Sequence, residues 1–416
     1  MNDSYAPVLL AYIDPGTGSM LFTVLLGLFS VLFYTAKGLF LKIKYSVGID
    51  KSNHDTNNYV IYTDSKRYWN TFKPVCDEFE KKQIELLYYT QSQDDPVFDI
   101  DYKYIKPSFI GEGNKAFSVL NFLKANILLS TTPSLDVYQW KRSKETMYYI
   151  HIPHMCSNIS LYRMFGVDYY DAVLVSNQLQ LEEVRQLELI KKIPEKEIRI
   201  VGLTYFDEMN KRLSKTEKSY NTVPIVLLAP SWGGNSLLNK YGCTLIDELL
   251  KTNYQIIIRP HPQSFISETN MLNDLMKKYP EIEWNTDNDN FDVLNKADIL
   301  ISDFSGVVFD FAIVFDKPII YTETEFDYSQ YDAYWLNEDA WTFELFSRLG
   351  KELNYDNICR IKEIIDDSLN NAKYSEERRK IKDEVWFNKG NAAKTIVDFM
   401  VEKNSLIVNR QSNNLN

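Results

Sequence analysis

Short apolar runs alternate with longer charged stretches along the chain after residue 58. An unbroken apolar run between polar segments is typical of a strand that is buried on both faces. Stretches of mixed charge such as Gln180–Lys192 are typical of surface helices. The alternation therefore predicts parallel sheets covered by helices. The predicted strands are Tyr59–Thr63, Ile84–Tyr89, Ile127–Ser130, Met147–Ile152, Ala172–Ser176, Ile198–Val201, Ile225–Ala229, Gln255–Ile258, Ile299–Ser302 and Ile319–Tyr321.

A polar stretch at Lys211–Thr222 interrupts this alternation and is predicted to link two halves. We expect an α/β protein with two Rossmann-like, doubly wound domains that face each other across a cleft. The first domain is assigned residues 46–215 and the second residues 220–375. The charged stretch Tyr374–Lys403 has a helical pattern, so residues 376–416 are predicted to form a C-terminal helix and tail.

The first 45 residues have a different pattern, with no charge between Met20 and Ala36 and further apolar residues up to Phe40. A run of roughly 20 residues matches the hydrocarbon thickness of a bilayer. A signal peptide would carry a positive segment before the run, whereas here the lead-in carries Asp3 and Asp14 and no Lys or Arg. We therefore expect an N-terminal membrane anchor at residues 1–45, with one transmembrane helix at about residues 19–40.

Basic residues determine the expected orientation of this anchor. Lys37, Lys42 and Lys44 follow the apolar run, and the positive-inside rule places that side in the cytoplasm. We expect a single-pass protein of the cell inner (plasma) membrane, with both α/β domains in the cytoplasm. The segment YIDPGTGS before the run carries turn-forming residues and is given no chemistry.

Composition excludes some classes of function. The formal net charge of −11 argues against a sequence-independent nucleic-acid binder, which is usually basic. The 416-residue chain has four cysteines, far apart and without a CxxC pair, so neither a disulfide framework nor a cysteine zinc site is favoured. The high aromatic content of 14% is compatible with sugar or base stacking and equally with coding bias.

A polar cluster, Ser302–Gly306, lies between a predicted strand and the predicted buried helix Val307–Phe315. Ligands of open parallel sheets bind beyond the carboxyl ends of the strands, and a helix N-terminus attracts phosphate. Gly306 lets an anion approach the backbone, and Ser305 can either cap the helix or bind a phosphate oxygen. The cluster predicts a phosphate site or an ordinary helix cap.

Two further strand ends carry polar residues. In IIIRPHPQSF, Arg259 and His261 follow a strand, on a loop that two prolines stiffen. Arginine is suited to bidentate contact with phosphate. In IVLLAPSWGG, Ser231 and Trp232 lie in a glycine-rich turn, where Trp232 either covers the core or stacks on a base. With the polar cluster, these loops favour a phosphate-binding site.

The segment YYIHIPHMCSN in the first half places His151 and His154 near a strand end. His151 alternates with strand residues and fits a packed strand, whereas His154 follows Pro153 and should point into the loop. Their spacing with Cys156 matches no standard zinc site, so we expect no metal. A histidine that faces the cleft is suited to act as a general base at neutral pH.

The second half resembles the CDP-glycerol glycerophosphotransferase family, which includes teichoic-acid primases and polymerases. The resemblance rests on APSWGG, RPHP, SDFSGVVFDF followed by DKPIIY, and WFNKGNAAKTIVDFM, together with HIPHMCSN and VGLTYFD earlier in the chain. It covers roughly Tyr148–Met400. The resemblance implies a GT-B-like fold and transfer of glycerol phosphate from CDP-glycerol to an acceptor, with release of CMP and without a cofactor.

The resemblance also implies roles for individual residues. His154 would be the base, with His151 as the alternative. The donor would be bound by Arg259, His261, Asp303, Ser305, Gly306, Ser231, Trp232 and Asp310, the last of which reaches a ribose hydroxyl or is a buried structural acid. The acceptor would be a lipid-linked glycan or cell-surface polymer at the membrane, and no nucleic acid is expected as a partner.

The chain departs from the family pattern at two positions. Many of these enzymes have glycine after the catalytic histidine, where this chain has Met155, and serine where it has Gly306. Two other functions therefore stay open. One is a GT-B glycosyltransferase that uses a nucleotide-sugar donor in surface polysaccharide synthesis, and the other is a non-catalytic, membrane-tethered binding protein.

Overall fold

The computed structural model describes Leu28, Phe29 and Leu32, together with residues 57–217, 221–322, 326–336 and 338–413. The described residues from 57 to 413 belong to one compact unit. The predicted transmembrane helix lies outside the described residues, apart from Leu28, Phe29 and Leu32, which are helical. No helix among the described residues combines the length and the apolar character that a bilayer span requires.

The described residues 57–200 form a seven-stranded sheet in which every pair of neighbouring strands is parallel. Its strand order is β3-β2-β1-β4-β5-β6-β7, with a switch point between β1 and β4. The strands β4 and β6 are buried along their whole length, as their apolar sequences require. The strands are β1 (Asn57–Thr63), β2 (Leu86–Thr90), β3 (Ile105–Phe109), β4 (Ala125–Ser130), β5 (Thr146–His151), β6 (Ala172–Val175) and β7 (Glu197–Ile200).

The described residues 225–353 form a second parallel sheet with the order β10-β9-β8-β11-β12-β13. The first six strands of the first sheet have the same relative order, that of dinucleotide-binding folds. Its switch point lies between β8 and β11. The strands are β8 (Ile225–Leu228), β9 (Gln255–Ile258), β10 (Glu283–Trp284), β11 (Ile299–Ser302), β12 (Ile319–Thr322) and β13 (Gly350–Leu353).

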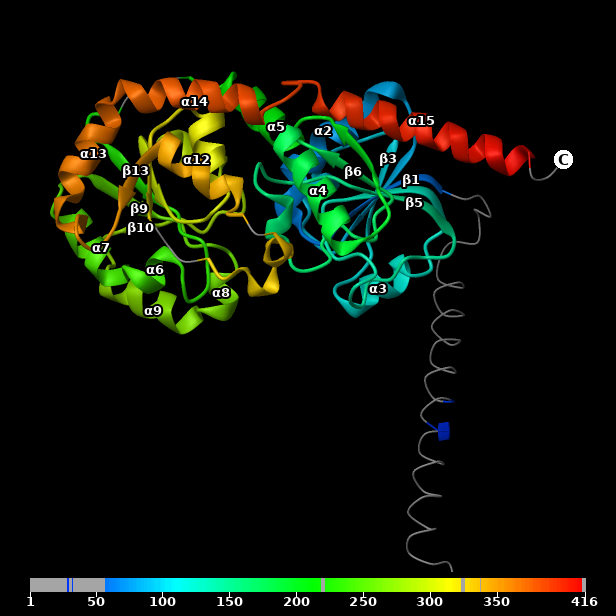
Figure 1. Ribbon diagram of the computed structural model, residues 1–416, viewed down its shortest axis with the longest axis horizontal. Coiled ribbons are helices and arrows are strands. Elements are labelled where there is room, and N and C mark those ends of the chain that lie inside the picture. Colours follow the sequence, from blue (N-terminus) through cyan, green and yellow to red (C-terminus); the bar gives the residue numbers. More distant parts are fainter. Residues whose placement is uncertain are drawn as a thin grey trace, which may run out of the picture. The chain divides into compact units, whose positions relative to one another are not determined.

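Helices surround both sheets (Figure 1). Their apolar faces close four buried clusters, two against each sheet. The helices are α2 (Trp69–Lys82), α3 (Asn114–Leu120), α4 (Gln178–Lys191), α5 (Thr204–Leu213), α6 (Leu237–Lys240), α7 (Gly242–Leu250), α8 (Ser264–Ser267), α9 (Thr269–Lys278), α10 (Phe291–Lys296), α11 (Val307–Phe309), α12 (Trp341–Leu349), α13 (Ile361–Asn370), α14 (Ala372–Val385) and α15 (Ala392–Asn413).

The predicted α/β class, the parallel sheets and the ten predicted strands are confirmed, with small differences at the strand ends. The edge strands β3, β10 and β13 were not predicted. β3 contains Pro107 and alternates in burial, which is typical of an edge strand and hides its pattern. The predicted linker was placed too early, because α5 continues to Leu213. The domain boundaries themselves stay predictions.

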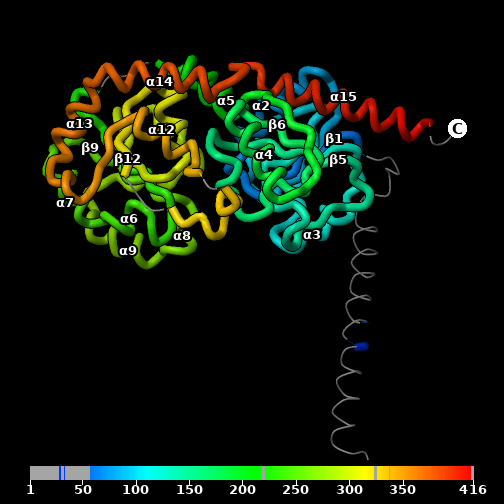
Figure 2. Tube along the Cα trace, viewed as in Figure 1, coloured from blue at the N-terminus to red at the C-terminus, as the bar shows by residue number. Residues whose placement is uncertain are grey.

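The C-terminal helices connect the two halves. α14 packs on α12 of the second half, and α15 packs on α2 and β4 of the first half, as the tube in Figure 2 traces. At the crossing, the Asp207 carboxylate accepts hydrogen bonds from Trp386 Nε1 at 3.0 Å and from Gly390 N at 2.7 Å. Gly202 has φ +93°, and a Cβ there would lie 2.5 Å from the carbonyl oxygen of Phe387. Glycine is therefore required where the returning chain crosses.

A buried ion pair joins the halves on the other side. Lys191, at the end of α4, contacts Asp332 Oδ1 at 2.6 Å and Asp168 Oδ1 at 2.8 Å. The Asp332 carboxylate, fully buried, also accepts hydrogen bonds from the backbone N–H groups of Phe165 and Gly166. We call Asp332 and its partners Lys191, Phe165 and Gly166 the Asp332 contact. It fixes the segment around Asp332 of the second half against a loop of the first half.

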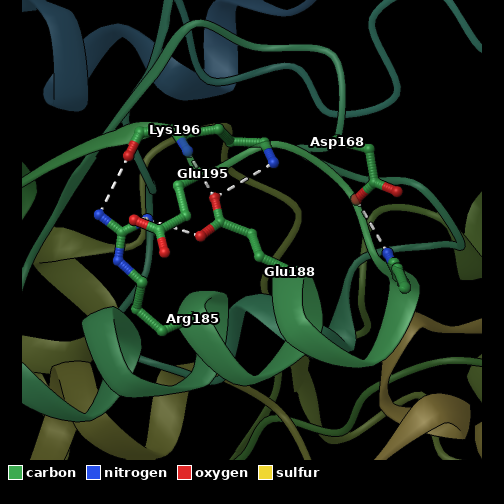
Figure 3. Close-up of polar contacts among 6 residues, drawn as sticks. Asp168, Arg185, Glu188, Glu195 and Lys196 are labelled. Carbon is green, nitrogen blue, oxygen red and sulfur yellow. Dashed lines mark hydrogen bonds and ion pairs between the residues drawn. The ribbon is translucent and has the colours of Figure 1, made fainter.

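A second polar cluster holds α4 in place. Glu188, 3% exposed, accepts hydrogen bonds from Arg185 Nη1 at 2.6 Å and from the backbone N–H of Lys196 at 2.8 Å. Figure 3 shows Arg185 and Glu188 pointing from the helix toward Glu195 and Lys196. Because α4 carries Lys191, this cluster also supports the Asp332 contact.

We predict that Asp332→Ala lowers the free energy of unfolding by about 3 kcal/mol, because it leaves a buried lysine with one carboxylate fewer and two backbone donors unpaired. Urea denaturation of the purified protein measures the loss. The same change at exposed Asp339 is the control. A loss equal to that of the control would show that the Asp332 contact does not stabilise the fold.

Candidate functional site

A cavity of about 340 Å³ lies at the carboxyl ends of strands from both sheets. The strands that supply its residues lie at or next to the two switch points, where α/β sheets bind ligands. Six residues predicted from the sequence line this cavity together: His154 from the first half, and Arg259, His261, Ser305, Gly306 and Asp310 from the second. The structure places His151, Ser231, Trp232 and Asp303 outside its lining.

A larger cavity, of about 460 Å³, lies between α2, α5 and the start of α15. Its charged side chains pair with one another: Lys211 lies 3.8 Å from both Asp77 and Glu208, and Lys81 lies 3.2 Å from Glu78. It contains none of the predicted site residues. Because its charges are already matched, the smaller cavity is the better candidate site.

The polar cluster after β11 mainly holds two loops together. Ser302 Oγ donates a hydrogen bond to the carbonyl oxygen of Ala229 at 2.6 Å. The fully buried Asp303 carboxylate accepts the N–H groups of Ser231 and Leu237, both at 2.8 Å. Burial raises the pKa of Asp303 to about 6. The geometry thus favours a positioning role for Asp303 and Ser231 over the predicted contact with a donor.

Ser305 and Gly306 are the members of the cluster that reach the cavity. The Ser305 hydroxyl lies 3.5 Å from the N–H of Val307, too far for a strong cap. The predicted buried helix is present as α11 followed by a π-helical turn, Asp310–Val314. A Cβ at Gly306 would lie 3.4 Å from Met155 Sδ of the first half. The glycine therefore leaves room where the halves approach each other.

Arg259 follows β9 and is oriented by the loop after β10. Its Nη1 donates to Asn285 Oδ1, and its Nη2 donates to the carbonyl oxygen of Asp287 at 2.8 Å. Both acceptors are neutral oxygens, so these bonds position the guanidinium without cancelling its charge. Burial lowers the pKa of Arg259, yet a guanidinium stays charged at neutral pH.

His261 is held in one tautomer. Its Nδ1 accepts a hydrogen bond from the backbone N–H of Gln263 at 3.1 Å, so the neutral ring carries its proton on Nε2. Burial, followed by the charge of Arg67, lowers the pKa of His261 to about 4. At neutral pH His261 therefore offers a phosphate a hydrogen bond rather than a positive charge. The Trp232 ring lies 6.4 Å from the His261 ring and backs it from outside the cavity lining.

His154 lines the cavity from the first half and is half-buried. Its Nδ1 lies 3.1 Å from Thr131 Oγ1, and its ring centroid lies 4.6 Å from that of Tyr68. Burial lowers the pKa of His154 to about 4, so the ring is neutral at pH 7 and able to accept a proton. With Nδ1 donating to Thr131, Nε2 would present its lone pair as the base.

His151 lies in a different environment. It is fully buried, and its Nε2 is 3.3 Å from the Tyr162 hydroxyl. Burial and then the nearby His154 lower its pKa to about 3. The rings of Tyr162 and Tyr170 pack against it, with centroids at 5.3 and 5.0 Å. These contacts favour a structural role for His151 over the alternative role of base.

The sequence did not point to the cavity residues that follow β1, nor to Thr131, which follows β4 and contacts His154. Lys66, Arg67 and Tyr68 form a short 3-10 turn after β1, and Thr131 follows β4 directly. The signal available was position, because these residues follow strands at the same sheet edge as His154. Their neighbours TDSKRYWN belong to the part of the chain that matched no family motif.

Asp310 lines the cavity, and both Asp310 and Asn290 lie within hydrogen-bonding distance of the Tyr205 hydroxyl. Tyr205 Oη lies 3.0 Å from Asn290 Oδ1 and 3.2 Å from Asp310 Oδ2, and one hydroxyl proton cannot serve both fully. Burial raises the pKa of Asp310 to about 7. Hydrogen bonds from Tyr205 and Asn290 oppose this rise, but burial outweighs them. In the described part of the chain, no group of three or more His, Cys, Asp or Glu side chains is arranged to hold a metal.

Residues 203–402 match the model of a family described as CDP-Glycerol:Poly(glycerophosphate) glycerophosphotransferase. Over 107 residues the chain is 33% identical to the minor teichoic acid biosynthesis protein GgaB of Bacillus subtilis (strain 168). That match covers 24% of this chain and 11% of the relative, so the chain spans about a tenth of the curated protein that it matches.

Solved structures share the fold. The wall teichoic acid polymerase TagF superposes with a TM-score of 0.59 at 16% identity, covering 92% of this chain and 99% of that one. UDP-N-acetylglucosamine 2-epimerase from Rickettsia bellii gives 0.56 at 11% identity, over 85% and 98%. The UDP-GlcNAc 2-epimerase from Neisseria meningitidis, bound to UDP-GlcNAc, gives 0.52 at 15%, over 83% and 100%. At these identities the likeness concerns the α/β fold, which resembles that of GT-B glycosyltransferases.

We predict that Asp310→Asn changes how stability depends on pH. The folded pKa of Asp310 lies above the ordinary value of 3.8, so the folded state binds its proton more tightly and wild-type stability falls as pH rises from about 4 to 7. Asparagine cannot ionise, so the variant escapes this loss. The free energy of unfolding of the variant relative to wild type should rise by roughly 2 to 3 kcal/mol between pH 5 and pH 8.

Chemical denaturation at both pH values tests this, with the same change at exposed Asp292 as the control. An identical difference between variant and wild type at the two pH values would mean that Asp310 does not lose its proton between pH 5 and pH 8 in the folded protein, and would contradict a pKa near 7.

Proposed function

Because residues 203–402 place the chain in the CDP-glycerol glycerophosphotransferase family, we propose that it transfers a glycerol-phosphate or other polyol-phosphate unit from CDP-glycerol to a glycan acceptor of teichoic-acid type, releasing CMP. One observation carries the proposal. A neutral histidine of the first half, His154, faces the phosphate-type loops of the second half, with Arg259 and His261, across one cavity.

The chemistry follows from these positions. The acceptor hydroxyl oxygen would attack the β-phosphorus of the donor while His154 accepts its proton. A new oxygen–phosphorus bond forms as the bond to the bridging oxygen breaks, and CMP leaves with that electron pair. Arg259 would offset the charge that develops on the leaving phosphate, and the Nε2–H of His261 would donate a hydrogen bond to it. Positioning and electrostatics supply most of the catalysis in such transfers.

A nucleotide-sugar donor is the second candidate. It is favoured by the shared fold with the epimerase bound to UDP-GlcNAc, since both donors carry a diphosphate in the same kind of cleft. In that case the attack would occur at a sugar carbon, and a nucleoside diphosphate would leave in place of CMP. The identity of the released nucleotide therefore separates the two candidates.

Membrane attachment is a further part of the proposal. The apolar run from Met20 to Phe40 would anchor the protein in the inner (plasma) membrane, with residues 57–413 on the cytoplasmic side. This would place the cavity next to a lipid-linked acceptor. The acidic net charge of −11 disfavours attachment to anionic lipid by surface charge. The anchor would provide membrane attachment without a basic surface.

We predict that His154→Ala lowers turnover of CDP-glycerol by 10²- to 10⁴-fold, the usual contribution of a general base. Release of CMP is measured with a membrane fraction as acceptor, and CDP-glycerol affinity should change by less than about 2-fold, because the base does not hold the donor. His151→Gln is the matched variant and should keep its turnover.

Full CMP release by His154→Ala would show that His154 is not the base, whereas absence of turnover in the wild type with either donor would support a non-catalytic binding protein. Release of a nucleoside diphosphate from a nucleotide-sugar, without CMP from CDP-glycerol, would favour the second candidate.

We predict that protease added to inside-out membrane vesicles digests residues 57–413, because the Lys37–Lys44 side of the anchor should face the cytoplasm. Immunoblotting of the fragments measures digestion, and right-side-out vesicles are the control. Protection in inside-out vesicles would reverse the orientation, and loss of the chain on an alkaline wash would argue against an integral anchor.

A further inference from the structure

The cavity contains two cations that no acidic side chain neutralises. Arg67 is exposed and lines the cavity, and neither Arg67 nor Arg259 has a carboxylate within 4.0 Å among the described residues. The other charges in the lining are engaged: Lys66 forms an ion pair with Asp94, and Asp289 with Arg212. Two guanidinium groups that form no ion pair with the described residues line one cavity, and a ligand with two negative charges would complement them.

Arg67 lies between the candidate base and the loops of the second half. The Ser65 side chain accepts the backbone N–H of Arg67 and begins the short turn that carries it. The next residue, Tyr68, packs its ring against His154 with the centroids 4.6 Å apart. The charge of Arg67 also lowers the pKa of His261, and only the burial of His261 lowers this pKa more. Arg67 thus lines the same cavity as His154 and His261, and its charge acts on His261.

We propose that Arg67 binds the phosphoryl group that is transferred, from the side of the base, while Arg259 and His261 hold the phosphate that leaves with the nucleoside. This inference rests on the proposed function. In an in-line displacement the attacking oxygen and the leaving oxygen lie on opposite sides of the phosphorus. The half that supplies the base is therefore nearest to the transferred group, and the half that binds the nucleotide is nearest to the leaving group.

This arrangement divides the negative charge of the diphosphate between the two halves. Arg67 forms and breaks no covalent bond; it offsets charge on the non-bridging oxygens of the phosphoryl group during transfer. The second half alone would then not bind the donor fully, because one of the two cations comes from the first half. CMP, which has no β-phosphate, would not contact Arg67.

The test compares the affinities of the full-length protein for CDP-glycerol and CMP by isothermal titration calorimetry. Arg67→Ala should weaken CDP-glycerol binding by roughly 10-fold or more, as expected for loss of a charge-assisted hydrogen bond, and should change CMP binding by less than about 2-fold. Arg67→Lys should restore part of the affinity, because it keeps the charge but not the bidentate geometry. Arg379→Ala, at an exposed arginine of α14, is the matched control.

Each result is decisive. An unchanged CDP-glycerol affinity in Arg67→Ala, an equal loss for CMP, or a change confined to the KM of the acceptor would overturn the assignment. Thermal melting checks that the variants are folded. Folded variants are expected, because Arg67 is exposed. If the wild type itself binds neither nucleotide, the proposed function fails together with this inference, and that failure is recognised before any variant is compared.

Discussion

The relative orientation of the two parallel sheets depends on a small set of buried polar contacts. The carboxylate of Asp332 enters the first half, pairs with Lys191 and binds two backbone N–H groups there. Nearby, the side chain of Asn158 accepts hydrogen bonds from the backbone N–H and hydroxyl of Thr342, at 2.9 and 2.6 Å. Polar partners with fixed directions specify one geometry, whereas apolar packing alone tolerates sliding. The cavity exists as a shared site because these contacts hold the sheet ends face to face.

Burial then determines which groups carry charge in that cavity. His154 and His261 both have pKa values near 4, so at neutral pH one is suited to accept a proton and the other to donate a hydrogen bond. Asp310, with a pKa near 7, adds less negative charge than a free carboxylate would. The positive potential of the site is therefore supplied by Arg67 and Arg259, one from each half. Under the proposed function, such a division would make both sheets necessary for the recognition of a diphosphate.

The two departures from the family pattern lie at the same place in space. Met155 follows His154 in the first half, and Gly306 follows Ser305 in the second. A Cβ on Gly306 would lie 3.4 Å from Met155 Sδ and 3.7 Å from Met155 Cβ. A larger residue on one side thus faces the smallest residue on the other. The two departures therefore lie opposite each other across the cleft, at a distance where a Cβ on residue 306 would make ordinary van der Waals contact with Met155.

The sequence by itself determined the parallel α/β class, ten of the described strands and the loops that carry polar residues, because continuous apolar runs and their polar ends are local features. It also indicated six of the residues that line the cavity. Only the tertiary structure showed that Asp303 holds a neighbouring loop, brought Arg67 to the cavity and placed Thr131 beside His154. The direction of a side chain and the charge that it keeps depend on partners far away in the chain. Those partners are brought together by the arrangement of neighbouring strands and their loops, which no local pattern encodes.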